Sequence, residues 1–183
     1  MRSVAELEPQ YREQAALLAE YVDLFLCETM STASEALAAA RGAASTGLPV
    51  WVSWTVADDG SGRLRSGEDI GDAVATLAGE HVDAVLVNCS MPESVDAAMP
   101  ALARHAGRPF GAYANGFEPI GPGHEIDAGR NVPEARSGLN PERYAAHVSG
   151  WLDAGAQIVG GCCEVGPAHI ARLRTLLDAR AAG

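Results

Sequence analysis

Short apolar runs alternate with segments of helical spacing along almost the whole length of this 183-residue chain. The runs are rich in β-branched and aromatic residues, which favours strands, whereas the segments between them repeat apolar residues at helical intervals. The predicted strands are 22–27, 49–54, 82–88, 109–113 and 156–159. Near-continuous apolar strands separated by helices predict an α/β fold, in which helices cover a parallel sheet. A chain of this length is expected to form one domain, over residues 1–183.

The helix boundaries are predicted from capping residues and prolines. Ser34 is the expected N-cap of the second helix, and Asn140 is an expected N-cap that places Pro141 in the first helical position. The predicted helices are 9–20, 35–46, 69–80, one that begins at 92, 141–153, and one that begins near 166. Residues 114–139 are rich in Gly and Pro, and they predict a long loop.

Polar side chains lie at the carboxyl ends of the predicted strands. Glu28, Asn88 and Asn115 each lie at such an end or just beyond it. In closed barrels and in open doubly wound sheets alike, ligands bind at this edge. We therefore expect these residues to line a binding site. For Asn88 and Asn115 there is an equally good alternative, because asparagine often simply ends a strand.

Three cysteines lie at the same edge of the predicted sheet. Cys89 follows the third strand, and Cys162 and Cys163 follow the fifth strand after Gly160 and Gly161. Successive side chains of a strand point to opposite faces, so Cys162 and Cys163 reach one ion only if the chain bends, and the glycines permit that bend. Three thiolates leave one position of a tetrahedral site open, as in catalytic zinc sites. The sequence therefore predicts a metal site that takes its fourth ligand from a substrate.

Other roles for the cysteines are possible. Cys89, taken alone, is the kind of small residue that is often buried in a core. Cys162 and Cys163 are a possible vicinal disulfide, although bridging neighbours strains the backbone. Cys27 alternates with Glu28 along the first strand and is expected to point toward the helices, so we leave it out of the site.

The charge and composition exclude several classes of partner. The formal net charge of −11 argues against nucleic acid and anionic membranes, because both require basic patches. No apolar run reaches the roughly 18 residues of a membrane-spanning helix, and the first residues contain no signal-peptide core. We therefore expect a cytoplasmic protein. In that reducing compartment, four clustered cysteines indicate metal binding or catalysis rather than disulfides.

Several short motifs carry a family resemblance. They are Cys-Glu-Thr-Met at 27–30, Val-Asn-Cys-Ser at 87–90, Tyr-Ala-Asn-Gly at 113–116, and Gly-Gly-Cys-Cys followed by Gly-Pro-Ala-His-Ile within 160–170. In this order they resemble the homocysteine S-methyltransferase family. The resemblance implies a zinc-dependent (β/α)8 barrel that transfers a methyl group from a donor to homocysteine. It further implies Zn²⁺ ligation by Cys89, Cys162 and Cys163, and amino-acid binding at the mouth by Glu28.

The residues themselves support this chemistry. A coordinating zinc deprotonates a thiol that is otherwise mostly protonated at neutral pH. Three protein thiolates and Zn²⁺ total −1, so a bound substrate thiolate stays electron-rich and suits attack on a methyl group of a sulfonium, a quaternary ammonium or a corrinoid. In this scheme Glu28 binds the homocysteine ammonium, while Asn88 and Asn115 orient polar groups.

The chain departs from the family in its length. A complete barrel has eight strands in about 250 residues, whereas about five βα units are predicted here. We therefore expect a truncated barrel that lacks the N-terminal strands, either as a fragment, as a component of a split protein or as a remodelled domain. A second copy or a partner chain is expected to cover the open sheet. Two hypotheses follow: a methyltransferase completed by a partner, or a non-catalytic zinc-binding relative.

Histidines and tryptophans are weaker candidates. His124, in the long loop, is expected to be solvated rather than to bind metal. His169 is expected to cap or pack at the start of the last helix. Trp51, Trp54 and Trp151 are expected mainly in the core. Among them Trp54, which ends its strand, is the candidate for a cation–π contact with a methylated donor.

Overall fold

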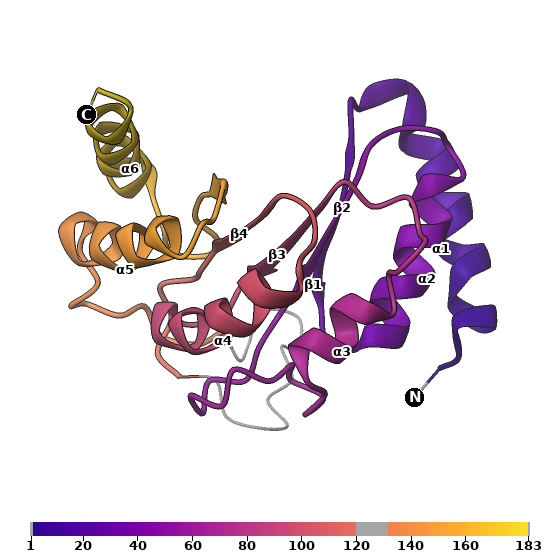
Figure 1. Ribbon diagram of the computed structural model, residues 1–183, viewed down its shortest axis with the longest axis horizontal. Coiled ribbons are helices and arrows are strands. Elements are labelled where there is room, and N and C mark those ends of the chain that lie inside the picture. The colour runs from indigo at the N-terminus through magenta and orange to yellow at the C-terminus, as the bar shows by residue number, and fades with distance from the viewer. Residues whose placement is uncertain (1, 120–131, 183) are drawn as a thin grey trace.

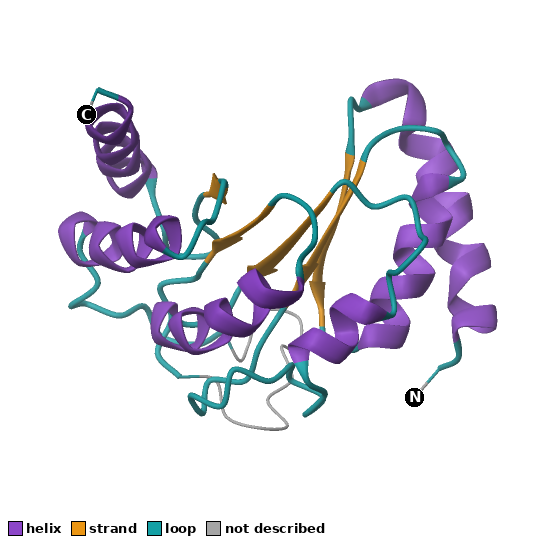
Figure 2. Ribbon diagram, in the orientation of Figure 1, coloured by secondary structure: helices purple, strands orange, loops and turns teal. Residues whose placement is uncertain are grey.

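The computed structural model describes residues 2–119 and 132–182. Its centre is a five-stranded parallel sheet with the strand order β1-β2-β3-β4-β5, the same as the order along the chain (Figure 2). The strands are β1 (Phe25–Met30), β2 (Val50–Trp54), β3 (Ala84–Asn88), β4 (Phe110–Tyr113) and β5 (Ile158–Val159). The predicted parallel α/β sheet is confirmed, with β1 and β5 as its two edges among the described residues.

A helix precedes β1 and a helix follows every strand, and these helices lie along one side of the curved sheet (Figure 1). They are α1 (Val4–Leu18), the 3-10 helix η1 (Ala19–Tyr21), α2 (Ala33–Ala44), α3 (Ile70–Ala75), α4 (Pro92–His105), α5 (Pro141–Asp153) and α6 (Pro167–Ala181). Within the described residues, no helix combines the length and apolar character needed to cross a membrane.

Two helices begin at other residues than predicted, because capping side chains, which the apolar pattern does not include, determine where they start. α1 begins at Val4 rather than at Pro9, since the Glu6 carboxylate accepts a hydrogen bond from the Ser3 N–H at 2.7 Å and completes a capping box. α2 is capped by Thr32, whose hydroxyl accepts from the Glu35 N–H at 3.1 Å, rather than by Ser34. The start of α5 is as predicted, with Asn140 as N-cap and Pro141 first.

The first strand lies three residues later than predicted. β1 extends to Met30, and its register with β2 shifts between Cys27 and Met30. Thr29 within this irregular stretch has a φ of 61°, in the left-handed region that a β-branched residue rarely adopts. Glu28 is therefore part of the strand end and not of a following loop.

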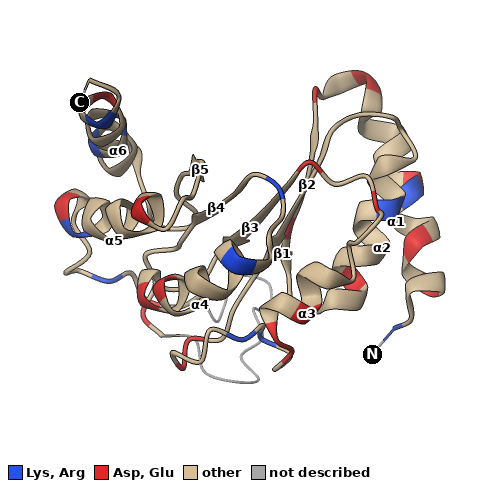
Figure 3. Cartoon of the chain, viewed as in Figure 1, with Lys and Arg blue, Asp and Glu red and all other residues tan. Residues whose placement is uncertain are grey.

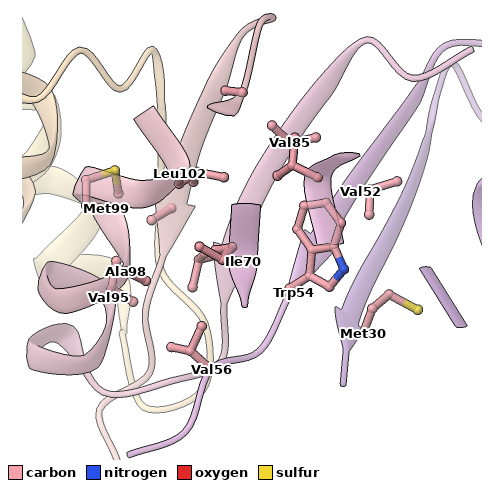
Figure 4. Close-up of a cluster of buried hydrophobic side chains, with 14 of the residues drawn as sticks. Met30, Val52, Trp54, Val56, Ile70, Val85, Val95, Ala98, Met99 and Leu102 are labelled. Atoms are coloured by element: carbon pink, nitrogen blue, oxygen red, sulfur yellow. The ribbon is translucent and has the colours of Figure 1, made fainter. Parts of the chain in front are cut away.

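The core lies between the sheet and its helices (Figure 4). Trp54 is fully buried there among apolar side chains from β2, β3, α3 and α4, so the expectation of a core role is confirmed and Trp54 is not available for a donor. Trp151 is also buried, and its Nε1 donates to Asp96 at 2.6 Å. The third tryptophan, Trp51, lines a hollow on the opposite face of the sheet.

That opposite, concave face carries no helix of the described residues (Figure 1). The side chains that line a hollow on it are largely apolar: Leu26, Trp51, Leu86, Tyr113 and Ile158. Charged residues lie mainly on the helices and loops, while the strands that form the sheet are almost free of charge (Figure 3). The sheet is thus buried by its own helices on one face only, as expected for part of a (β/α) barrel.

Candidate functional site

Three cysteine sulfurs meet at the carboxyl edge of the sheet. The Sγ atoms of Cys89, Cys162 and Cys163 all lie within 4.8 Å of one another. Cys163 Sγ lies 4.0 Å from Cys89 Sγ and 3.8 Å from Cys162 Sγ. All the cysteines are free thiols, so the cluster predicted from the sequence is present as thiols in this structure.

Main-chain hydrogen bonds hold these cysteines at the strand ends. The Cys89 N–H donates to the Tyr113 carbonyl at 3.3 Å, which ties the end of β3 to the end of β4. The Cys162 N–H donates to the Ala114 carbonyl at 2.9 Å, and the Cys163 carbonyl accepts from the Gly116 N–H at 2.8 Å. The segment after β5 is therefore fixed against the segment after β4, and its thiols face Cys89.

Backbone conformation at this edge is unusual. Among the described residues, the non-glycine residues with positive φ are Thr29 (61°), Cys89 (50°) and Glu164 (62°), and each is a site residue or its direct neighbour. Such conformations cost of order 1–3 kcal/mol each and persist where the surroundings impose them. Gly160 and Gly161 were expected to supply the bend, but neither has positive φ. Gly161 is required for close packing instead, since a Cβ there would lie 2.2 Å from Val165 Cγ1.

The thiols polarise one another. The nearby Cys162 thiol lowers the pKa of Cys89, and the nearby Cys89 thiol raises the pKa of Cys162. The Asn115 amide contributes a smaller lowering of the Cys89 pKa. Burial raises the pKa of Cys163.

The donor set and its spacing fit a zinc ion. Tetrahedral zinc with Zn–S bonds of about 2.3 Å holds its sulfurs about 3.8 Å apart. The two Sγ–Sγ distances to Cys163, 3.8 and 4.0 Å, match this spacing, and the third lies within 4.8 Å. Three sulfurs are one fewer than a closed structural site uses, so the arrangement leaves room for a ligand from a substrate.

Glu28 lies at the end of β1, across the concave face from β3 and β5, the strands that the clustered cysteines follow. Its side chain is exposed, and Oε2 accepts a hydrogen bond from the Tyr113 hydroxyl at 3.1 Å. A carboxylate held at the mouth in this way is available to a cationic group of a ligand.

Asn88 is fully buried, and its side chain makes hydrogen bonds within the protein. Its Oδ1 accepts from the Thr29 N–H at 2.9 Å and from the Ser53 hydroxyl at 2.8 Å, and its Nδ2 donates to Thr29 Oγ1 at 2.8 Å. In this structure Asn88 therefore contacts the residue that follows Glu28 rather than open space.

Asn115 is also fully buried. Its Oδ1 accepts from the Phe117 N–H at 3.2 Å, which is a turn of the kind expected for asparagine at a strand end. Its Nδ2 is buried and has no hydrogen-bond partner among the described residues. Asn115 thus combines the turn role with an unpaired donor next to Cys89.

Cys27 lies outside the cluster, as expected. It is packed against the core, and burial raises its pKa to about 11. His169 has the expected capping role, because its Nδ1 accepts from the Gly166 N–H at 3.2 Å, which leaves Nε2 to donate to the Leu139 carbonyl at 2.9 Å. His124 lies outside the described residues.

Sequence reasoning missed Ser53, which hydrogen-bonds Asn88. The signal for it was a hydroxyl within the otherwise apolar run Val50–Trp54. Tyr113 was expected to turn its hydroxyl toward the mouth but was left out of the site residues, and the structure places that hydroxyl against Glu28.

Comparisons with known proteins agree with this geometry. The family model for homocysteine S-methyltransferase matches residues 1–177. The chain is 34% identical over 163 residues to homocysteine S-methyltransferase of Escherichia coli (strain K12), covering 87% of this chain and 49% of that protein. It is 29% identical over 180 residues to selenocysteine Se-methyltransferase of Brassica oleracea var. italica, covering 95% of this chain and 49% of that protein.

The fold is similar to a solved structure of the same kind. The homocysteine methyltransferase MmuM from Escherichia coli, in its metallated form, superposes with a TM-score of 0.72 at 30% sequence identity, covering 96% of this chain and 53% of that chain. The chain thus spans about half the length of the relatives it matches. With a family match over nearly all of its residues, the chain belongs to the homocysteine S-methyltransferase family.

Proposed function

We propose that this chain carries the zinc and homocysteine site of a homocysteine S-methyltransferase. The observation that carries the proposal is the meeting of three thiols within 4.8 Å at the carboxyl ends of β3 and β5. Cys89, Cys162 and Cys163 would hold Zn²⁺, and the homocysteine sulfur would take the fourth position. When bound, the metal supplies deprotonation of that thiol at neutral pH.

The reaction is a nucleophilic displacement at a methyl carbon. A new bond forms between the homocysteine sulfur and the methyl group, the bond from the methyl group to the donor breaks, and its electron pair leaves with the donor. The products are methionine and the demethylated donor. The net charge of −11 favours attraction of a cationic donor, such as a sulfonium or a quaternary ammonium.

The polar residues at the mouth bind the amino-acid part of homocysteine and do not contact the bonds that form and break. Glu28 binds the ammonium group through a charge-assisted hydrogen bond. Asn88, which is buried and bonded to Thr29, positions the end of β1 beneath Glu28. Asn115 directs its buried amide donor toward the Cys89 thiol, whose pKa it lowers.

The open sheet favours a second candidate function as well. With both sheet edges and the concave face uncovered by described residues, the chain is also suited to be a non-catalytic zinc-binding relative. We place the methyltransferase first, as a single domain that acts together with a partner chain, a second copy or a further protein segment covering the sheet. Its four free thiols favour a reducing compartment such as the cytoplasm.

One set of measurements tests both candidates. The chain, purified with a thiol reductant and without chelator, is expected to contain about one zinc per protomer and to bind L-homocysteine. Methionine formation is then assayed with sulfonium, quaternary ammonium and methylcorrinoid donors, with L-selenocysteine as a second acceptor. The assays are run on the chain alone and with the part of the Escherichia coli relative that it does not match. Zinc binding without turnover in any arm would favour the non-catalytic candidate, and no zinc uptake would reject both.

A further inference from the structure

Tyr113 connects the two sides of the proposed site. Its hydroxyl, on β4, donates to Glu28 Oε2 on β1 at 3.1 Å, although β2 and β3 lie between these strands. Its carbonyl accepts from the Cys89 N–H at 3.3 Å. One residue therefore contacts both the carboxylate proposed to bind the ammonium and the backbone of a proposed zinc ligand.

Two glycines lie near the Tyr113 side chain in the sheet. Gly111, two residues earlier on the same face of β4, has no side chain, because a Cβ there would lie 1.8 Å from the Ile158 carbonyl oxygen. Gly160 lies beside Tyr113, because a Cβ on Gly160 would lie 3.4 Å from Tyr113 Cβ, at ordinary van der Waals distance. The Tyr113 side chain also lines the apolar hollow of the concave face. It therefore borders the apolar interior and the polar edge at once.

The contact with Glu28 has a fixed polarity. Burial raises the pKa of Tyr113, so its hydroxyl keeps its proton and donates. The carboxylate can only accept, and one of its two oxygens is held by the phenol. This hydrogen bond thus restrains the position from which the Glu28 carboxylate reaches a ligand.

We infer that Tyr113 is a positioning residue that fixes the span between Glu28 and the sulfur site, and thereby selects thiol amino acids by chain length, favouring homocysteine over cysteine. The inference rests on the proposed function. Relatives named for homocysteine and for selenocysteine, whose carbon chains differ by one methylene, match this chain with identities of 34% and 29%. Overall sequence similarity therefore does not identify the thiol or selenol acceptor. A restrained Glu28 would discriminate between acceptors, because one methylene typically changes enzyme selectivity by about 10- to 200-fold.

The test compares Tyr113→Phe with the unaltered protein. Zinc-loaded chains are titrated with L-homocysteine and with L-cysteine by calorimetry, and the zinc content is checked after each titration. Tyr113→Phe is expected to raise the Kd for homocysteine about tenfold, the loss of one hydrogen bond to a charged group, and to change the Kd for cysteine less. The preference for homocysteine should fall accordingly. Tyr11→Phe is the matched control, because it removes the same kind of bond, to Glu35 at 3.0 Å, on the helical side.

A double variant separates positioning from a general structural effect. In a Glu28→Gln background, Tyr113→Phe is expected to change the preference no further, because Tyr113 acts through Glu28. An equal effect of Tyr113→Phe in both backgrounds would overturn the inference, and so would an unchanged preference for homocysteine in Tyr113→Phe alone. In either case, zinc and homocysteine binding by the unaltered chain would leave the proposed function standing. Failure of the unaltered, zinc-loaded chain to bind homocysteine would overturn the proposed function and this inference with it.

Discussion

Asn88 and Thr29 are joined by two hydrogen bonds that connect β3 to β1 across the intervening strand. The Thr29 N–H donates to Asn88 Oδ1 at 2.9 Å, and Asn88 Nδ2 donates to Thr29 Oγ1 at 2.8 Å. The Ser53 hydroxyl of β2 completes the group by donating to the same Oδ1 at 2.8 Å. This buried amide accounts for the left-handed conformation of Thr29, because its hydrogen bonds fix the backbone that follows Glu28.

Removal of this amide should destabilise the fold. We expect Asn88→Ala to lower the free energy of unfolding by about 1–3 kcal/mol, because the Thr29 N–H and the Ser53 hydroxyl lose a buried acceptor. Asn88→Asp keeps the acceptor and should retain more stability than Asn88→Ala. Urea denaturation followed by circular dichroism measures both. Equal stability of Asn88→Ala and the unaltered protein would contradict a structural role for this group.

Metal binding should depend on the three clustered thiols and not on the fourth cysteine. We expect Cys162→Ala or Cys163→Ala to abolish zinc binding, because two sulfurs do not hold the ion in a tetrahedral thiolate site. Cys27→Ala is the control: Cys27 lies against the core, so its loss should lower stability and leave the zinc content at about one per chain. Elemental analysis of each purified variant gives the result. Zinc retained in Cys162→Ala would show that the cluster is not the site.

Gly111 should be essential to the site although it carries no functional group. A Cβ at this position would lie 1.8 Å from the Ile158 carbonyl oxygen, so Gly111→Ala must push β5 away from β4. Because Cys162 follows β5, we expect weaker zinc binding as well as lower stability. Gly150→Ala is the control, since nothing lies within 4 Å of a Cβ in that helical position. It should leave zinc binding unchanged and add about 0.5–1 kcal/mol of stability.

Stability should fall as the pH rises past the pKa of His147. Its Nδ1 lies 2.7 Å from Asp96 Oδ2, which raises the pKa of His147 in the folded protein above its ordinary value of 6.5. A raised pKa means that the protonated form stabilises the fold, fully below about pH 6.5, and that this contribution is lost as the pH rises through the folded value.

The matching variant is Asp96→Asn, which keeps an acceptor for Trp151 Nε1 and removes the charge. Glu93 also raises the His147 pKa and Arg136 lowers it, and both remain in the variant. We expect the free energy of unfolding to decline more between pH 6 and pH 8.5 in the unaltered protein than in Asp96→Asn. Parallel curves would mean that this pair makes no pH-dependent contribution.

The strands and the last helices could be predicted because their signals are local. An apolar run flanked by turn residues predicts a strand, and Asn140 followed by Pro141 predicts the start of α5. The cysteine cluster could be predicted for a related reason. Parallel strands bring their carboxyl ends to one edge, so residues far apart in the chain meet there once the sheet is recognised.

What could not be predicted depends on partners distant in the sequence. The end of β1 is determined by pairing with β2 and by the Asn88 amide. From the sequence alone, Glu28 and Thr29 were predicted to lie just past the end of the strand. The N-cap of α2 is Thr32, and the neighbouring Ala33 N–H donates to the side chain of Glu68, 35 residues away in the sequence, at 3.2 Å. The bond from Tyr113 to Glu28 depends on the curvature of the sheet, and residue spacing carries no such signal.

The identity of strand order and chain order has a consequence for how the molecule opens. Each βα unit packs mainly against the units before and after it, as in a linear repeat array, where fraying starts at an end and moves inward. Three links at the carboxyl edge skip strands: Asn88 to Thr29 across β2, Tyr113 to Glu28 across β2 and β3, and Cys89 to Cys163 across β4. An ion bound by the three sulfurs would therefore couple the last unit to the middle of the array. Amide hydrogen exchange in α5 and α6 should slow on metal loading, while exchange in α1 stays the same.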